Sequence, residues 1–186
     1  MKFKSEVRDL LKVVGVGVLV SVLVCVVLAF VVVAILFPHR SPPKENQVIQ
    51  NFYAHRASFE RLRDMLIEDK KLVRVAGWGV QTTTSMGTTE HRTGDFSPDR
   101  YNQYLALLKE VGGIGAHRDR NEPPVDVCVW VHASGWAGDT RHLDVCWENQ
   151  PPMSQVASLD DFYRTPRPRK SVFRHVDGNW YLWADW

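Results

Sequence analysis

The stretch VDVCVWVHASGWAGDTRHLDVCWE, residues 125–148, has the pattern of an antiparallel β-hairpin. Valines alternate with other residues in its first run, and apolar residues alternate with polar ones in its last run. Such alternation is expected of strands whose successive side chains point to opposite faces. The small and polar residues 134–140 between the runs are typical of a connecting loop. We therefore expect two neighbouring antiparallel strands here.

Pairing these strands across the loop places Cys128 directly opposite Cys146, and Val131 opposite Leu143. Opposed Cα atoms in such a pair lie about 4.5–5.5 Å apart, so the two cysteines are disulfide candidates in an oxidising compartment. Two free, buried thiols are the alternative, because a register slip of one residue would put the cysteines on opposite faces.

A second hairpin is predicted at the C-terminus, where Asp177 and Gly178 join the runs KSVFRHV and NWYLWADW. The Asp-Gly pair readily adopts the positive φ angles of a tight turn. The last run is apolar on both of its faces. We therefore expect a covered core strand rather than an aromatic platform for a ligand.

Two helices are predicted ahead of these hairpins. Apolar residues recur every three or four positions along residues 48–66, and residues 97–113 begin with Ser97 and Pro98 and end with two glycines. These are helix periodicity and helix start and stop signals. Residues 72–84 have the β-branched pattern of one strand. The sequence thus predicts an α+β domain in which an antiparallel sheet packs on two helices.

Residues 13–37 form an apolar run without charge or proline. As a helix this run would extend about 38 Å, against about 30 Å for the hydrocarbon core of a bilayer. A cleaved signal peptide has a shorter apolar core, and a lipoprotein signal has a small residue where Val24 precedes Cys25. We therefore predict a single-pass transmembrane helix that acts as a signal anchor.

Four Lys and Arg among residues 1–12 predict a cytoplasmic N-terminus at a bacterial inner membrane. Residues 38–45 have the composition of a linker, and residues 46–186 are then a periplasmic or extracellular domain. Small residues recur every fourth position on one face of the anchor and predict a homodimer. They are Gly17, Ser21, Cys25 and Ala29. Chance spacing in a valine-rich run is the alternative.

The chain holds 23 Lys and Arg and 21 Asp and Glu, of which four bases and two acids precede residue 13. The outer domain is therefore neutral, and no nucleic-acid partner is expected. A local basic patch would suit an anionic surface or an envelope protein, unless Asp160 and Asp161 balance it in a solvated loop. The patch consists of Arg164, Arg167, Arg169, Lys170 and Arg174.

No nucleophile elbow, phosphate-binding loop or metalloprotease motif occurs in the sequence. The best remaining polar set brackets the loop of the central hairpin and consists of His132, Asp139, His142 and Asp144. Two histidines and a carboxylate can ligate zinc, but this spacing matches no established pattern. We therefore expect no metal, no cofactor and no catalytic residue.

Three segments, SPDRYNQYLALLKEVGG, SLDDFYR and FRHVDGNWYLWADW, resemble a group of uncharacterised bacterial proteins anchored by a signal segment or a lipid. The resemblance runs from about Val48 to the end, and the last segment is its most specific part. It implies no site residues, because the outer domain of that group has no assigned function. The long apolar span without a lipid-attachment site departs from the group.

These patterns favour a noncatalytic interaction or ligand-binding module of unknown specificity outside the cytoplasm. An envelope enzyme that uses His132, Asp139 and His142 is the alternative, and a structural subunit of a membrane complex is a third hypothesis. A concave pocket lined by the two histidines would favour the enzyme.

Overall fold

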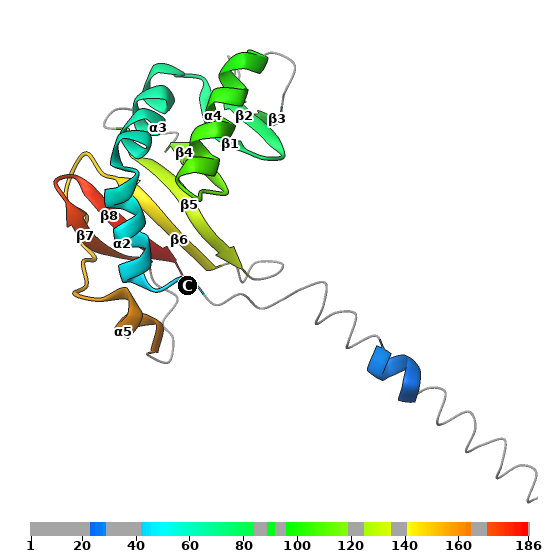
Figure 1. Ribbon diagram of the computed structural model, residues 1–186. Coiled ribbons are helices and arrows are strands. Elements are labelled where there is room, and N and C mark those ends of the chain that lie inside the picture. The colour runs from blue at the N-terminus through cyan, green and yellow to red at the C-terminus, as the bar shows by residue number, and fades with distance from the viewer. Residues whose placement is uncertain are drawn as a thin grey trace, which may run out of the picture. The chain divides into compact units, whose positions relative to one another are not determined.

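The computed structural model describes residues 23–28, 42–83, 89–91, 96–118, 125–134, 141–164 and 171–185. The chain divides into two compact units, Met1–Ser41 and Pro42–Trp186, so that the boundary falls within the predicted linker. The second unit contains the sheet and the helices that cover it (Figure 1).

The prediction of a membrane-spanning helix over residues 13–37 is wrong for the part of the chain that the structure describes. No helix there is both long enough and apolar enough to cross a bilayer. Residues 23–28 are helical and exposed. The rest of that run lies outside the described residues, as do Gly17, Ser21 and Ala29 of the predicted dimer face.

The described residues have an α+β structure, with one sheet of eight strands in the order β3-β2-β1-β4-β5-β6-β8-β7. Every neighbouring pair in it is antiparallel. The strands are β1 Leu72–Ala76, β2 Gly79–Thr83, β3 Thr89–His91, β4 Gly115–Arg118, β5 Val127–Ser134, β6 Arg141–Trp147, β7 Ser171–Asp177 and β8 Trp180–Asp185. The predicted strand over residues 72–84 is in fact two, because the chain folds back at Gly77 and Trp78 into Gly79, whose φ is 132°.

Helices α2, α3 and α4 cover one face of this sheet, and the short α5 lies beside its β7 edge (Figure 1). Their bounds are α2 Glu45–Ala54, α3 Arg56–Glu68, α4 Pro98–Glu110 and α5 Leu159–Arg164. The predicted single helix over residues 48–66 is broken at His55, whose φ of −121° is not helical. The prediction for α4 is confirmed, since Ser97 accepts a hydrogen bond from Arg100 N and Pro98 opens the helix.

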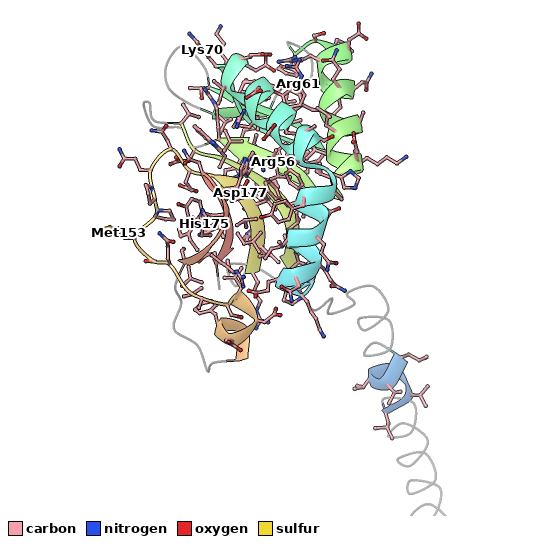
Figure 2. All side chains as sticks on the ribbon, turned by 60° about the vertical axis from the view of Figure 1, so that its left-hand side comes forward. Arg56, Arg61, Lys70, Met153, His175 and Asp177 are labelled. Carbon is pink, nitrogen blue, oxygen red and sulfur yellow. A yellow bond between two sulfur atoms is a disulfide. The ribbon has the colours of Figure 1, made fainter. Side chains whose placement is uncertain are left out.

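Aromatic packing joins the helices to the C-terminal hairpin. The rings of Phe52 and Phe59 lie 5.3 and 6.1 Å from the ring of Trp180, measured between centroids. Trp180, Leu182 and Ala184 are all buried in the same cluster. An ion pair of 2.5 Å between Arg56 of α3 and Asp177 of the β7–β8 turn adds to this contact (Figure 2). The prediction that β8 is a core strand is therefore confirmed for the face that carries Trp180, Leu182 and Ala184.

The central hairpin pairs as predicted from Val127 to Trp130, with Cys128 opposite Cys146. A bulge then shifts the register, so that His132 lies opposite Leu143. The predicted pairing of Val131 with Leu143 is wrong, because a β-bulge places two residues of one strand opposite one residue of the other.

Candidate binding groove on the face opposite the helices

Strand alternation divides the side chains of the sheet between two faces. One row across the strands is fully buried under the helices and consists of Val75, Ala116, Val129, Val145 and Leu182. Residues one position away along each strand project from the opposite face. We call this second face the open face.

Two cross-strand rows form the centre of the open face. The first runs over β1, β4, β5, β6, β8 and β7 and consists of Arg74, His117, Cys128, Cys146, Tyr181 and His175. The second consists of Gly115, Trp130, Asp144, Trp183 and Phe173. The open face therefore joins rings and ionisable groups from strands that are distant in sequence.

Rings of the open face form a nearly continuous array. The Trp130 ring lies 5.3 Å from His117 and 6.5 Å from His142, and the His142 ring lies 6.4 Å from Trp183 at an interplanar angle of 18°. The Arg74 guanidinium lies 4.8 Å from the Trp130 centroid, in cation–π geometry. Gly115 permits this arrangement, because a Cβ there would approach Trp130 Cε3 to 2.5 Å.

A groove of about 510 Å³ crosses the open face. Its lining comes from several strands and their ends, and it includes Arg74, His117, Arg118, Asp126, Cys128, Glu148, Phe173 and Trp183. Four strand spacings separate β4 from β7, which is about 19 Å. The groove is thus long enough for an extended ligand and within the volume range of ligand sites.

Charge in the groove is balanced, with Arg74 and Arg118 against Asp126 and Glu148. The Nε of Arg118 is buried without a hydrogen-bond partner in the described part of the chain. Burial also lowers the pKa of this guanidinium, since desolvation disfavours its charged form. A ligand that accepts a hydrogen bond from Arg118 would satisfy this donor.

Asp144 lies between Trp130 and Trp183 in the cross-strand register and is fully buried. Neither of its carboxylate oxygens has a hydrogen-bond partner among the described residues. Burial raises the pKa of Asp144 well above 3.8, and the neighbouring charge of Asp185 raises it further. The protonated, uncharged carboxyl is therefore favoured.

The predicted polar set is only partly brought together. His142 and Asp144 share the open face of β6, whereas His132 lies on β5 with its Nε2 3.2 Å from Ser134 Oγ. Burial lowers the pKa of both imidazoles, so their neutral forms are favoured. Asp139 lies outside the described residues.

Cys128 and Cys146 form a disulfide across β5 and β6, with their Cα atoms 4.0 Å apart. Cys128 is 9% exposed and lines the groove, whereas Cys146 is fully buried. Sulfur, imidazole and carboxylate donors cluster around this bond. While the two sulfurs are bonded to each other, neither is a thiolate that could ligate a metal ion.

Of the side chains in the predicted basic patch, the described part of the structure includes that of Arg174. Its guanidinium pairs with Glu45 of α2, a carboxylate that is 6% exposed and also accepts a 2.6 Å hydrogen bond from Leu159 N. Glu45 thus links α2 to both β7 and α5. Arg167, Arg169 and Lys170 lie outside the described residues, as does the side chain of Arg164.

The sequence patterns did not predict three residues of the groove, Arg74, His117 and Trp183, as candidate site residues. Each of the three lies at a position where strand alternation directs its side chain to the open face. What brings the three together is the pairing of strands that are distant in sequence, which no local pattern records. Comparison with known protein families, curated proteins and solved structures found no match to this chain. The geometry of the groove is therefore the basis of the functional proposal.

Proposed function

We propose that the unit Pro42–Trp186 is a noncatalytic ligand-binding module whose ligand lies in the groove of the open face. The observation that supports this function is the groove itself, about 510 Å³ in volume, in which aromatic rings and charged groups converge from separate strands. Few such sites occur per protein, and they combine an apolar platform with a small number of polar groups.

The balanced charge of the groove favours an uncharged, hydroxyl-rich ligand. A hydroxyl both donates and accepts, so it can bond to the carboxylates of Asp126 and Glu148 and to the guanidinium of Arg118. Sugar rings present apolar faces that pack on Phe173 and Trp183. The length of the groove suits several linked rings. We therefore propose a neutral carbohydrate chain as the ligand.

Asp144 is the residue that most favours the alternative of an enzyme, because a carboxyl with a raised pKa is suited to general acid catalysis. A general acid must come within hydrogen-bond distance of the substrate. Asp144 is fully buried beneath the surface of the groove. Binding without catalysis is therefore the better supported function.

We also propose that the module acts in an oxidising compartment outside the cytoplasm. The Cys128–Cys146 disulfide supports this location, since such bonds persist mainly in secreted and envelope proteins. Alkylation of unreduced protein from native cells, followed by mass spectrometry, should leave both cysteines unlabelled. Labelling of both would place the protein in a reducing compartment.

Carbohydrate binding can be tested on the full chain, kept in detergent because of its apolar residues 13–37. The protein should be retarded in affinity electrophoresis through neutral polysaccharides, and calorimetry with the fragments of a retarding polymer should give the affinity. Trp183→Ala should weaken binding about tenfold or more, because it removes a central aromatic contact.

Trp78→Ala is the matched control, since Trp78 is 54% exposed in the β1–β2 turn and does not line the groove. This variant should bind like the wild type. The proposal fails if no neutral carbohydrate binds, or if the two tryptophan substitutions have equal effects.

A further inference from the structure

Donor atoms of three kinds gather at the floor of the groove. His117, Cys128 and Cys146 are direct cross-strand neighbours on β4, β5 and β6, and Asp144 follows on the same face of β6. One ligand atom from each of His117, Cys128 and Asp144 lies within 4.8 Å of the other two. The Sγ atoms of Cys128 and Cys146 are already joined.

Reduction would change the chemistry of this cluster. Two electrons and two protons from a dithiol reductant break the S–S bond and leave two thiols, while the dithiol itself becomes a disulfide. A metal ion then displaces the protons of its ligands, which pass to water. Two thiolates, an imidazole and a carboxylate are donors that Zn²⁺ prefers in tetrahedral coordination.

We propose that reduction of the Cys128–Cys146 disulfide converts the floor of the groove into a Zn²⁺ site formed by His117, Cys128, Cys146 and Asp144. The disulfide and the metal exclude each other, because both use the same two sulfur atoms. The proposal does not depend on carbohydrate binding, and either can fail without the other.

Three of the four proposed ligands, His117, Cys128 and Asp144, already lie close together. Ligand atoms at 2.0–2.3 Å from a tetrahedral zinc ion lie roughly 3.3–3.8 Å from one another. The ligand atoms of His117, Cys128 and Asp144 lie within 4.8 Å of one another, so these three need to approach by at most about 1.5 Å, which side-chain rotation can supply. The Cys146 sulfur must move away from the Cys128 sulfur once their bond is broken. The sheet itself holds the three strands in place on both sides of the hairpin.

The buried carboxylate gives independent support for a ligand at this point. Asp144 is fully buried, and neither of its oxygens has a hydrogen-bond partner in the part of the chain that the structure describes. Buried polar groups are rarely left in this state, since each costs free energy. Coordination to a cation would satisfy the carboxylate. Cys128 lines the groove, so both a reductant and Zn²⁺ can approach from solvent.

Glu148 is a competing carboxylate, because it also lies within 4.8 Å of both sulfurs. We assign the fourth position to Asp144, which is buried beside His117, whereas Glu148 is half-buried. The two assignments are separated by Asp144→Asn and Glu148→Gln. The first substitution should weaken zinc binding, and the second should leave it unchanged.

The test uses the detergent-solubilised full chain with Cys25→Ser, so that no third thiol is present. The oxidised protein and protein reduced by a phosphine are titrated with Zn²⁺ against a chromophoric chelator, and Co²⁺ is used as a spectroscopic substitute. The reduced protein should bind one equivalent, with the thiolate charge-transfer and d–d bands of a tetrahedral cobalt site. The oxidised protein should bind none at this position.

His117→Ala should lower the zinc affinity of the reduced protein about 100-fold or more, since even second-shell substitutions cost 10–100-fold. His175→Ala is the matched control, because His175 is an exposed histidine on β7, away from the cluster. It should bind zinc like the parent protein. Circular dichroism of each reduced sample verifies that the domain remains folded.

Three results would overturn the proposal: folded, reduced protein that binds no zinc, equal binding before and after reduction, or full affinity in His117→Ala. The comparison of oxidised with reduced parent protein needs no substitution. A variant that fails to fold therefore does not prevent the test.

Discussion

Glu45 and Asp144 are both buried carboxylates, yet their surroundings differ in a way that decides their roles. Glu45 accepts hydrogen bonds from Arg174 and Leu159 N, so its charge is compensated. Asp144 has no hydrogen-bond partner among the described residues, and its protonated form is favoured instead. Removing one partner of a buried ion pair destabilises the fold, whereas an uncompensated carboxyl makes stability depend on pH.

Replacement of Glu45 tests the first of these roles. Glu45→Gln keeps the size of the side chain but leaves the Arg174 cation without its counter-charge, and we expect a loss of about 2 kcal/mol. Glu60→Gln is the control, since the Arg56–Glu60 pair is exposed, and its cost should stay below about 0.5 kcal/mol. Urea denaturation of the full chain measures both values, and equal losses would contradict this role for Glu45.

The pH dependence of stability tests the second role. The pKa of Asp144 is raised in the folded state, so its stabilising contribution is fully present below the unfolded pKa of about 3.8. That contribution is lost as the pH rises towards the folded pKa. Asp144→Asn, which cannot ionise, should therefore lose less stability than the wild type between pH 4 and pH 8. Denaturation across this range measures the two slopes, and parallel curves would show that Asp144 does not titrate in this way.

At the scale of elements, glycines and a helix break determine where the chain changes direction. Gly178 has a φ of 56° in the β7–β8 turn, and Gly79 has a φ of 132° at the start of β2. His55 ends α2 and begins α3, which lets both Phe52 and Phe59 reach Trp180. The glycine turns and the break at His55 thus let the apolar faces of the helices and strands pack into the same core.

Two turn glycines offer a matched comparison. Gly178→Ala forces a residue with a Cβ into the left-handed region and should cost about 1 kcal/mol. At Gly77, as at Gly178, no atom lies within 4 Å of the position of an added Cβ, but Gly77 does not have a positive φ. Gly77→Ala should therefore cost less than about 0.5 kcal/mol. Thermal denaturation of the two variants separates backbone strain from steric crowding by the added methyl group. Similar melting temperatures would exclude backbone strain as the cause of any destabilisation in Gly178→Ala.

For the whole molecule, the disulfide links β5 and β6, two adjacent inner strands of the eight-stranded sheet. The bond joins cysteines that are 18 positions apart in the sequence, and such a closed loop restricts the unfolded chain more than the folded one. Global unfolding must separate β5 from β6 and both from their neighbours. The stability of the whole sheet therefore depends on the redox state of one bond.

Reduction in the presence of a metal chelator should lower the free energy of unfolding by roughly 3 kcal/mol. Cys128→Ser should remove this sensitivity to reductant, whereas Cys25→Ser should preserve it, because Cys25 is not part of the bond. Melting curves with and without a phosphine reductant measure the effect. A reduced wild type that melts like the oxidised protein would show that the bond contributes nothing to stability.

Local pattern by itself determined the elements whose signals lie within one short segment. The alternation of residues 125–148 predicted the central hairpin and the pairing of Cys128 with Cys146, and Ser97 with Pro98 predicted the start of α4. Asp177 and Gly178 predicted the last turn. Each of these features depends on the preferences of neighbouring residues, which sequence periodicity and turn chemistry record directly.

Only the tertiary structure decided which of these elements lie side by side. The pairing of β4 with β1 and β5, and of β6 with β8, places His117 beside Cys128 and Asp144 between two tryptophans. The break at His55 and the bulge after Trp130 were likewise not predicted from the local pattern. The physical reason is that burial selects strand neighbours by the fit of whole apolar faces, and many pairings of similar strands satisfy the same local pattern.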